Sequence, residues 1–82
     1  MEKNKLRLLV VEDEKKLCDI IAKSLHQAGH EVDVCNDGEE ALHMIYAEMY
    51  DLIVLDLNLP GMDGMEIFRE LRKENEETKV LI

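Results

Sequence analysis

Three carboxylates stand directly after apolar stretches of the sequence. Glu12 and Asp13 follow the run LRLLVV, and Asp56 follows the run LIVL. If these runs are neighbouring parallel strands, their carboxyl ends meet at one edge of a sheet and bring the three acids together. Carboxylates at such short range repel one another, so they either take up protons or share a hard divalent cation such as Mg²⁺.

Asp56 is placed as a reactive group would be. The apolar residues 52–55 before it would hold its backbone rigidly, and a proline and two glycines soon after it break the strand. A carboxylate fixed beside a cation can attack phosphorus, because Asp is a known nucleophile in aspartyl phosphate formation and a metal offsets charge on the transferring oxygens. The ordinary alternatives are a strand-ending turn acid at Asp56 and simple helix capping by the acids at 12 and 13.

The rest of the chain must supply the sheet that positions these acids. Short apolar runs typical of buried strands alternate with stretches whose apolar residues recur at helical spacing. The predicted order is strand 6–11, helix 15–29, strand 30–36, helix 37–49, strand 51–56, helix 64–73 and strand 78–82. This order predicts parallel βαβ units with right-handed crossovers, forming an open α/β sheet with helices on both faces.

Polar residues and glycines are expected to mark the helix ends. Asp13 is the predicted N-cap of the first helix, and Gly29 is the predicted residue just past its end. Asp37 and Asp63 each stand three residues before a Glu, which is the capping-box spacing of the second and third helices. The apolar faces expected to point inward are Leu17, Ile20, Ile21, Leu25 and Ala28, then Ala41, Leu42, Ile45 and Met49, then Met65, Ile67, Phe68 and Leu71.

Length and charge narrow the possible functions. The chain has 82 residues and a net charge of −9, which fits one small domain and argues against non-specific binding to nucleic acid or anionic lipid. No apolar run approaches the length of a membrane span or a signal peptide. Cys18 and Cys35 form no disulfide framework, so we expect them to be core residues of a cytoplasmic protein.

The combined motifs resemble the receiver domain of two-component response regulators. The resemblance rests on VVEDE at 10–14, DGEEAL at 37–42 and DLIVLDLNLPGMDG at 51–64. It implies a flavodoxin-like (CheY-like) α/β fold with strand order 2-1-3-4-5 when complete. The phosphohistidine of a sensor kinase would be the phosphoryl donor. The sequence LNLPGMDG at 57–64 most resembles regulators that also carry a winged-helix DNA-binding domain.

The resemblance also assigns the site. Asp56 would be the phosphoacceptor, and Mg²⁺ would be held by Glu12, Asp13, Asp56 and the backbone carbonyl of Asn58. One member of the acidic pair at 12 and 13 would reach the metal through water.

Two residues of the family pattern have no match among residues 1–82. A receiver carries a Ser or Thr at the end of strand four and a Lys at the end of strand five, and both contact the phosphoryl group. Thr78 and Lys79 are not substitutes, because they stand at the start of strand four. We therefore expect residues 1–82 to be the N-terminal part of a receiver, lacking the rest of strand four, helix four, strand five and helix five.

Such a chain should be phosphorylated poorly or not at all. It should also form homo-oligomers or segment-swapped dimers, because strand edges and apolar faces are left open. Two other functions compete with a phosphoacceptor. A flavin or nucleotide binder would need a Gly-rich or hydroxyl-rich loop where the sequence has EDEKK, and an idle assembly fragment would keep the acids without using them.

Overall fold

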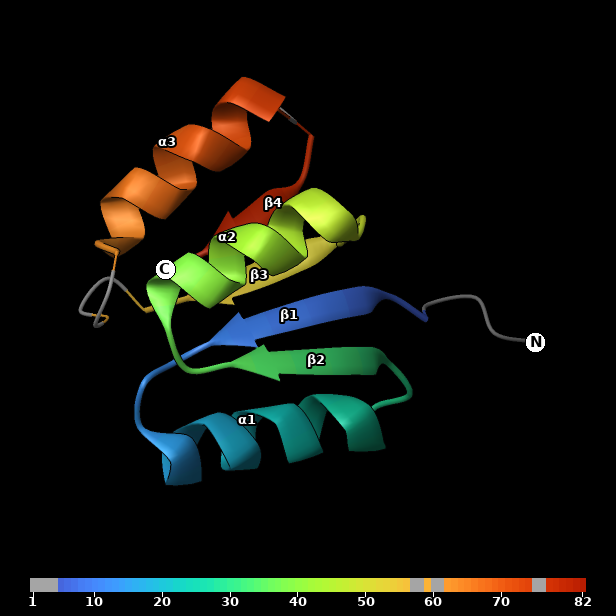
Figure 1. Cartoon of the computed structure of the whole chain (residues 1–82). Coiled ribbons are helices and arrows are strands. Elements are labelled where there is room, and N and C mark those ends of the chain that lie inside the picture. Colours follow the sequence, from blue (N-terminus) through green and yellow to red (C-terminus); the bar gives the residue numbers. More distant parts are fainter. Residues whose placement is uncertain (1–4, 57–58, 60–61, 75–76) are drawn as a thin grey trace.

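The computed structural model describes residues 5–56, 59, 62–74 and 77–82. Strands and helices alternate along these residues, as Figure 1 shows. In chain order the elements are β1 (Arg7–Val11), α1 (Lys15–Gln27), β2 (Glu31–Cys35), α2 (Gly38–Ala47), β3 (Leu52–Leu55), α3 (Gly64–Glu74) and β4 (Lys79–Leu81). The predicted β-α-β-α-β-α-β order is confirmed.

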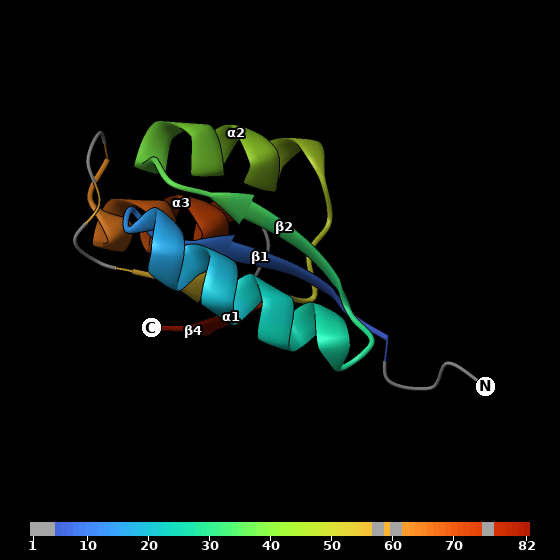
Figure 2. The same ribbon diagram turned by 90° about the horizontal axis from the view of Figure 1, so that it is seen from below.

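The four strands form one parallel sheet with the order β2-β1-β3-β4. This order matches the first four strands of the predicted 2-1-3-4-5 sheet. In register, Val11 at the end of β1 pairs with Cys35 on one side and Leu55 on the other. The sheet has α1 on one face and α2 and α3 on the other, as seen from below in Figure 2. The strands that precede the acids are therefore neighbours, as expected.

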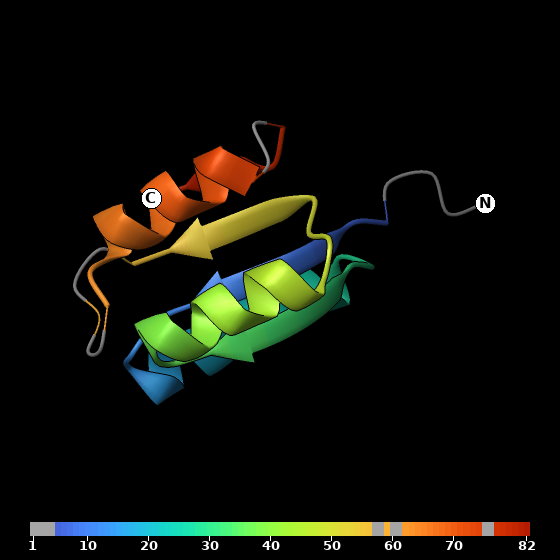
Figure 3. The same cartoon turned by 45° about the horizontal axis from the view of Figure 1, so that its top comes forward.

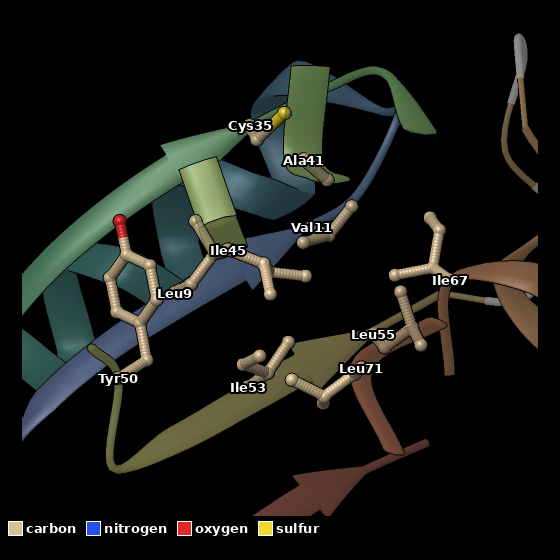
Figure 4. Packing of buried hydrophobic residues seen from close by; sticks show 10 residues of the cluster. All are labelled: Leu9, Val11, Cys35, Ala41, Ile45, Tyr50, Ile53, Leu55, Ile67 and Leu71. Atoms are coloured by element: carbon tan, nitrogen blue, oxygen red, sulfur yellow. The ribbon is translucent and has the colours of Figure 1, made fainter. Parts of the chain in front are cut away.

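The main core lies between the sheet and the pair α2 and α3, which lie side by side over it in Figure 3. β1 is buried from Leu8 to Val11, which confirms that its unbroken apolar run is covered on both faces. Burial of a large aliphatic side chain contributes about 1.5–3 kcal/mol, so this layer fixes β1 and β3 firmly. Figure 4 shows the cluster, which comprises Leu9, Val11, Cys35, Ala41, Ile45, Tyr50, Ile53, Leu55, Ile67 and Leu71.

Two of the three predicted N-caps are confirmed. The Asp37 carboxylate accepts from the Glu40 N–H at 3.1 Å, and the Asp63 carboxylate accepts from the Met65 N–H at 3.1 Å. The prediction for α1 is wrong, because its N-cap is Glu14, which makes no side-chain capping bond.

The end of α1 follows the prediction. Gly29 has φ 102°, a left-handed conformation that glycine adopts without strain. Its N–H donates to the His26 carbonyl at 2.9 Å, and the His30 N–H donates to the Leu25 carbonyl at 3.3 Å. This pair of bonds is the Schellman motif.

Five residues assigned to inward faces are exposed: Leu17, Ile20, Ala28, Met49 and Met65. Met49 is 76% exposed because α2 ends at Ala47, before Met49 is reached. Leu17 and Ile20 are 40% and 66% exposed because α1 packs on the sheet through the fully buried Cys18 instead. In Figure 2 α1 is the sole helix of the described chain on its side of the sheet, so nothing in this part of the molecule covers its outer apolar side.

Candidate functional site

Two backbone hydrogen bonds extend the ladders by one residue beyond the strands. The Asp56 N–H donates to the Val11 carbonyl at 3.0 Å, and the Glu12 N–H donates to the Cys35 carbonyl at 3.0 Å. Glu12 and Asp56 are therefore fixed at the carboxyl end of the sheet by the same pairing that builds it. Their backbones have defined positions independently of any ligand.

The side chains of Glu12, Asp13 and Asp56 converge at this edge. One carboxylate oxygen from each lies within 4.8 Å of the others. Glu12 and Asp56 are half-buried, whereas Asp13 is exposed. The predicted acidic cluster is confirmed for these three residues, and the fourth expected ligand, Asn58, lies outside the described residues.

The local electrostatics follow from burial and from like charge. Partial burial is the main factor that raises the pKa of the Glu12 carboxyl above its usual value. The Glu14 N–H, which donates to Glu12 Oε2 at 3.2 Å, lowers that pKa, and the nearby negative charge of Asp56 raises it again. The bond to Glu14 also satisfies an amide next to the first turn of α1. The N-cap of α1 is Glu14, and the Asp13 carboxylate lies with the cluster.

The donor set suits a small hard cation. All three groups are carboxylates, and Mg²⁺ takes oxygen ligands at about 2.0–2.1 Å in octahedral geometry, which places ligand oxygens roughly 3–4 Å apart. An upper separation of 4.8 Å is slightly wider than this. A small closure, or one ligand bound through water at the exposed Asp13, would complete the fit. The three residues could therefore hold Mg²⁺.

Thr78 and Lys79 lie at the opposite edge of the sheet, as expected. Thr78 is buried before β4, where its hydroxyl donates to the Tyr50 carbonyl at 3.4 Å. Lys79 pairs in register with Leu52, the first residue of β3, whereas Asp56 follows the last. Neither residue can reach a group bound at Asp56.

The structure adds two residues that the sequence analysis missed. The Asn36 side-chain amide donates to the backbone carbonyl of Glu12 at 2.7 Å. Gly38, the first residue of α2, is packed against the backbone of Met62. Both contacts join residues more than twenty positions apart, so spacing along the chain could not reveal them. The single cue in the sequence is the pair Asp37–Gly38, which was interpreted as a helix start.

Comparison with known proteins gives a match to one family model. A family model described as "Response regulator receiver domain" matches residues 8–82. The transcriptional regulatory protein TctD of Salmonella typhimurium is 46% identical over 77 residues, which cover 94% of this chain and 34% of TctD. The chain thus spans about a third of the length of this curated relative.

Solved structures agree with the family match. A receiver domain protein described as CheY-like, from Methanospirillum hungatei, has a TM-score of 0.90 at 28% identity, covering 94% of this chain and 62% of that one. TrrA of Thermotoga maritima, in complex with Mg²⁺-BeF, has a TM-score of 0.86 at 38% identity, covering 90% and 64%. TrrA has also been crystallised in complex with the histidine kinase ThkA, with a TM-score of 0.83 at the same identity and coverage. No helix in the described part of the chain is long and apolar enough to span a membrane.

Proposed function

The chain belongs to the response regulator receiver family, and on that premise we propose that Asp56 accepts a phosphoryl group from the phosphohistidine of a sensor kinase. The observation that carries this proposal is the convergence of Glu12, Asp13 and Asp56 within 4.8 Å at the carboxyl edge of β1 and β3. The complexes of TrrA with Mg²⁺-BeF and with ThkA support both the metal and the type of partner.

In the proposed reaction, an Asp56 carboxylate oxygen attacks phosphorus, forming an O–P bond as the N–P bond of the donor phosphohistidine breaks. The imidazole leaves with the bonding electron pair and regains a proton from solvent. The chain's own contribution is to hold the Asp56 backbone on the β1 ladder and to keep the acids at 12 and 13 beside it. Mg²⁺, held by Glu12, Asp13, Asp56 and the backbone carbonyl of Asn58, would offset negative charge on the transferring phosphoryl group.

We propose further that the 82-residue chain performs this transfer poorly. Receivers place a hydroxyl and an ammonium group on the phosphoryl group. Among the described residues, Thr78 and Lys79 lie at the other edge of the sheet, so neither supplies these groups at Asp56. Loss of a preorganised donor to a developing negative charge typically costs about a hundredfold or more in rate. In a longer protein, a receiver of this type would act in the cytoplasm and control a DNA-binding output domain, as the description of TctD as a transcriptional regulatory protein suggests.

The test is phosphorylation of the 82-residue chain by acetyl phosphate with Mg²⁺, followed by intact-mass measurement and peptide mapping. We expect a slow gain of one phosphoryl group at Asp56, absent from Asp56→Asn. The matched control is Asp51→Asn. Asp51 stands directly before β3, whereas Asp56 stands directly after it. The Asp51 carboxylate accepts the Arg7 N–H at the opposite edge of the sheet from the acidic cluster. A modification that persists in Asp56→Asn would overturn the proposal.

A second possibility is that this chain is an idle assembly fragment that forms homo-oligomers or exchanges segments. The observation that favours it is the set of exposed apolar side chains around β4, where Leu81 is 59% exposed, and on α1. β4 is also an edge strand, and no strand of the described chain pairs with its outer side. Sedimentation velocity over a concentration series distinguishes the cases. Concentration-dependent dimers, together with no modification at Asp56, would favour the assembly fragment.

A further inference from the structure

The turn between β2 and α2, residues 35–38, contacts both loops that carry the acids. On one side, the Asn36 amide donates to the Glu12 carbonyl at 2.7 Å, and the Cys35 carbonyl accepts the Glu12 N–H at 3.0 Å. Both polar groups of the Glu12 backbone are thus bound to this turn. A residue whose N–H and C=O are both engaged has little freedom to shift along or across the strand.

On the other side, the turn meets the loop that follows Asp56. A Cβ atom at Gly38 would lie 2.3 Å from the Met62 carbonyl oxygen and 2.9 Å from its nitrogen. Real Cβ contacts are not this short, and both opposing atoms are backbone, so a side chain could not be accommodated by a simple rotamer change. Glycine therefore permits the backbone of Met62 to lie directly on the first residue of α2. Figures 1 and 3 show the start of α2 and the start of α3 at the same edge of the sheet.

The turn itself is held by the residue between these two. The Asp37 carboxylate caps α2 by accepting the Glu40 N–H at 3.1 Å. Each of three consecutive residues thus has a different partner: Asn36 holds the end of β1, Asp37 holds α2, and Gly38 accommodates the loop after β3. Asn36 is half-buried and does not belong to the main apolar cluster, so its contact with Glu12 is not a by-product of core packing.

We propose that Asn36 and Gly38 are positioning residues for the metal site, setting the separation between the acids at 12 and 13 and Asp56. The inference rests on the proposed function, since it concerns the same site. Asn36 acts through the Glu12 backbone, and Gly38 acts through the backbone of Met62. Groups that orient metal ligands typically change metal affinity by about ten- to a hundredfold when they are removed.

The experiment compares Mg²⁺ affinity with fold stability in four forms of the 82-residue chain. These forms are the wild type, Asn36→Ala, Gly38→Ala and Gly29→Ala. Isothermal titration with Mg²⁺ gives the affinity, and urea unfolding without metal gives the stability. Gly29→Ala is the matched control, because it introduces the same methyl group at a positive φ with open space around it, at the far end of α1. It should lower stability without changing Mg²⁺ affinity.

We expect Asn36→Ala and Gly38→Ala to weaken Mg²⁺ binding by about tenfold or more. Asn36→Ser, which retains a short donor, should recover part of the loss. If Gly38→Ala does not fold, the Mg²⁺ affinities of Asn36→Ala and Asn36→Ser still test whether Asn36 positions the metal site. Wild-type affinity in Asn36→Ala, or an equal loss of affinity in Gly29→Ala, would overturn the inference alone. A wild-type chain that binds no Mg²⁺ would overturn the proposed metal site and this inference with it.

Discussion

Replacing Asp56 with Asn should make the metal-free chain more stable. The substitution keeps the shape of the side chain and removes one of three negative charges that lie within 4.8 Å of one another. Two unit charges at this distance repel by about 0.9 kcal/mol with water-like screening and by about 3.5 kcal/mol at an effective dielectric constant of 20. Because Asp13 is exposed and the other two acids are only half-buried, the lower figure applies. Relief of two repulsions then gives about 1–2 kcal/mol.

Mg²⁺ should offset most of this difference in stability. A ligand that binds only the folded state stabilises it by about 1.4 kcal/mol at ten times its dissociation constant. For a domain of this size, 1 kcal/mol corresponds to a shift of about 4–8 °C in Tm. Wild type should therefore gain roughly 6–11 °C with that concentration of Mg²⁺, and Asp56→Asn should gain much less.

The assay is thermal unfolding followed by circular dichroism at pH 8, in EDTA and across a Mg²⁺ series. Glu31→Gln is the control for the loss of one negative charge, because Glu31 lies at the far edge of the sheet in exposed ion pairs with Lys5 and Arg7. Such pairs contribute little, so this variant should be no more stable than wild type and should respond normally to Mg²⁺. If Asp56→Asn is less stable than wild type in EDTA, or responds fully to Mg²⁺, the three acids do not form one site.

Three further outcomes follow from the packing and capping. Ile53→Ala should cost about 2–5 kcal/mol in urea unfolding, because Ile53 is 1% exposed in the main core, and a cost below 1 kcal/mol would contradict that packing. Asp37→Ala should cost about 1 kcal/mol through loss of the Glu40 N–H acceptor, and an unchanged urea midpoint would show that this cap is not formed. Burial raises the pKa of the Cys35 thiol to about 11, so folding stability should fall as pH rises from 9 towards 11, where the unfolded chain ionises first. Alkylation of Cys35 at pH 8 should accordingly be slow until the chain unfolds, and rapid labelling of the native chain would refute its burial.

The sheet and the acidic cluster could be predicted from the sequence for a physical reason. Buried parallel strands are unbroken apolar runs, so the runs before Glu12 and Asp56 were visible without a structure. Right-handed crossovers then limit which strands can be neighbours, and both runs end at the same edge. The convergence of the acids is a property of this topology rather than of any local motif.

Local signals failed where a tertiary contact decides the outcome. Asp13 has the residue type and position of an N-cap, but the N-cap of α1 is Glu14, and the Asp13 carboxylate lies with those of Glu12 and Asp56. Leu17 and Ile20 have the spacing of an inward face, yet Cys18 is the fully buried residue of α1, with its Sγ 3.9 Å from the Val10 carbonyl oxygen. The periodicity of apolar residues indicates that a helix has an apolar face, but it does not indicate which element covers that face.

The backbone contacts at the site also explain how the chain accommodates repelling charges next to its core. Glu12 and Asp56 are fixed by ladder bonds that continue β1 and β3, and those strands are held by the apolar cluster, which extends to Val11 and Leu55 directly before the acids. The repulsion therefore acts on side chains that can turn toward water, at an edge where Asp13 is already exposed. A cation then finds ligands whose backbones need little reorganisation, so most of its interaction energy is available for binding. Contacts that hold the backbones, such as those of Asn36 and Gly38, matter for the same reason.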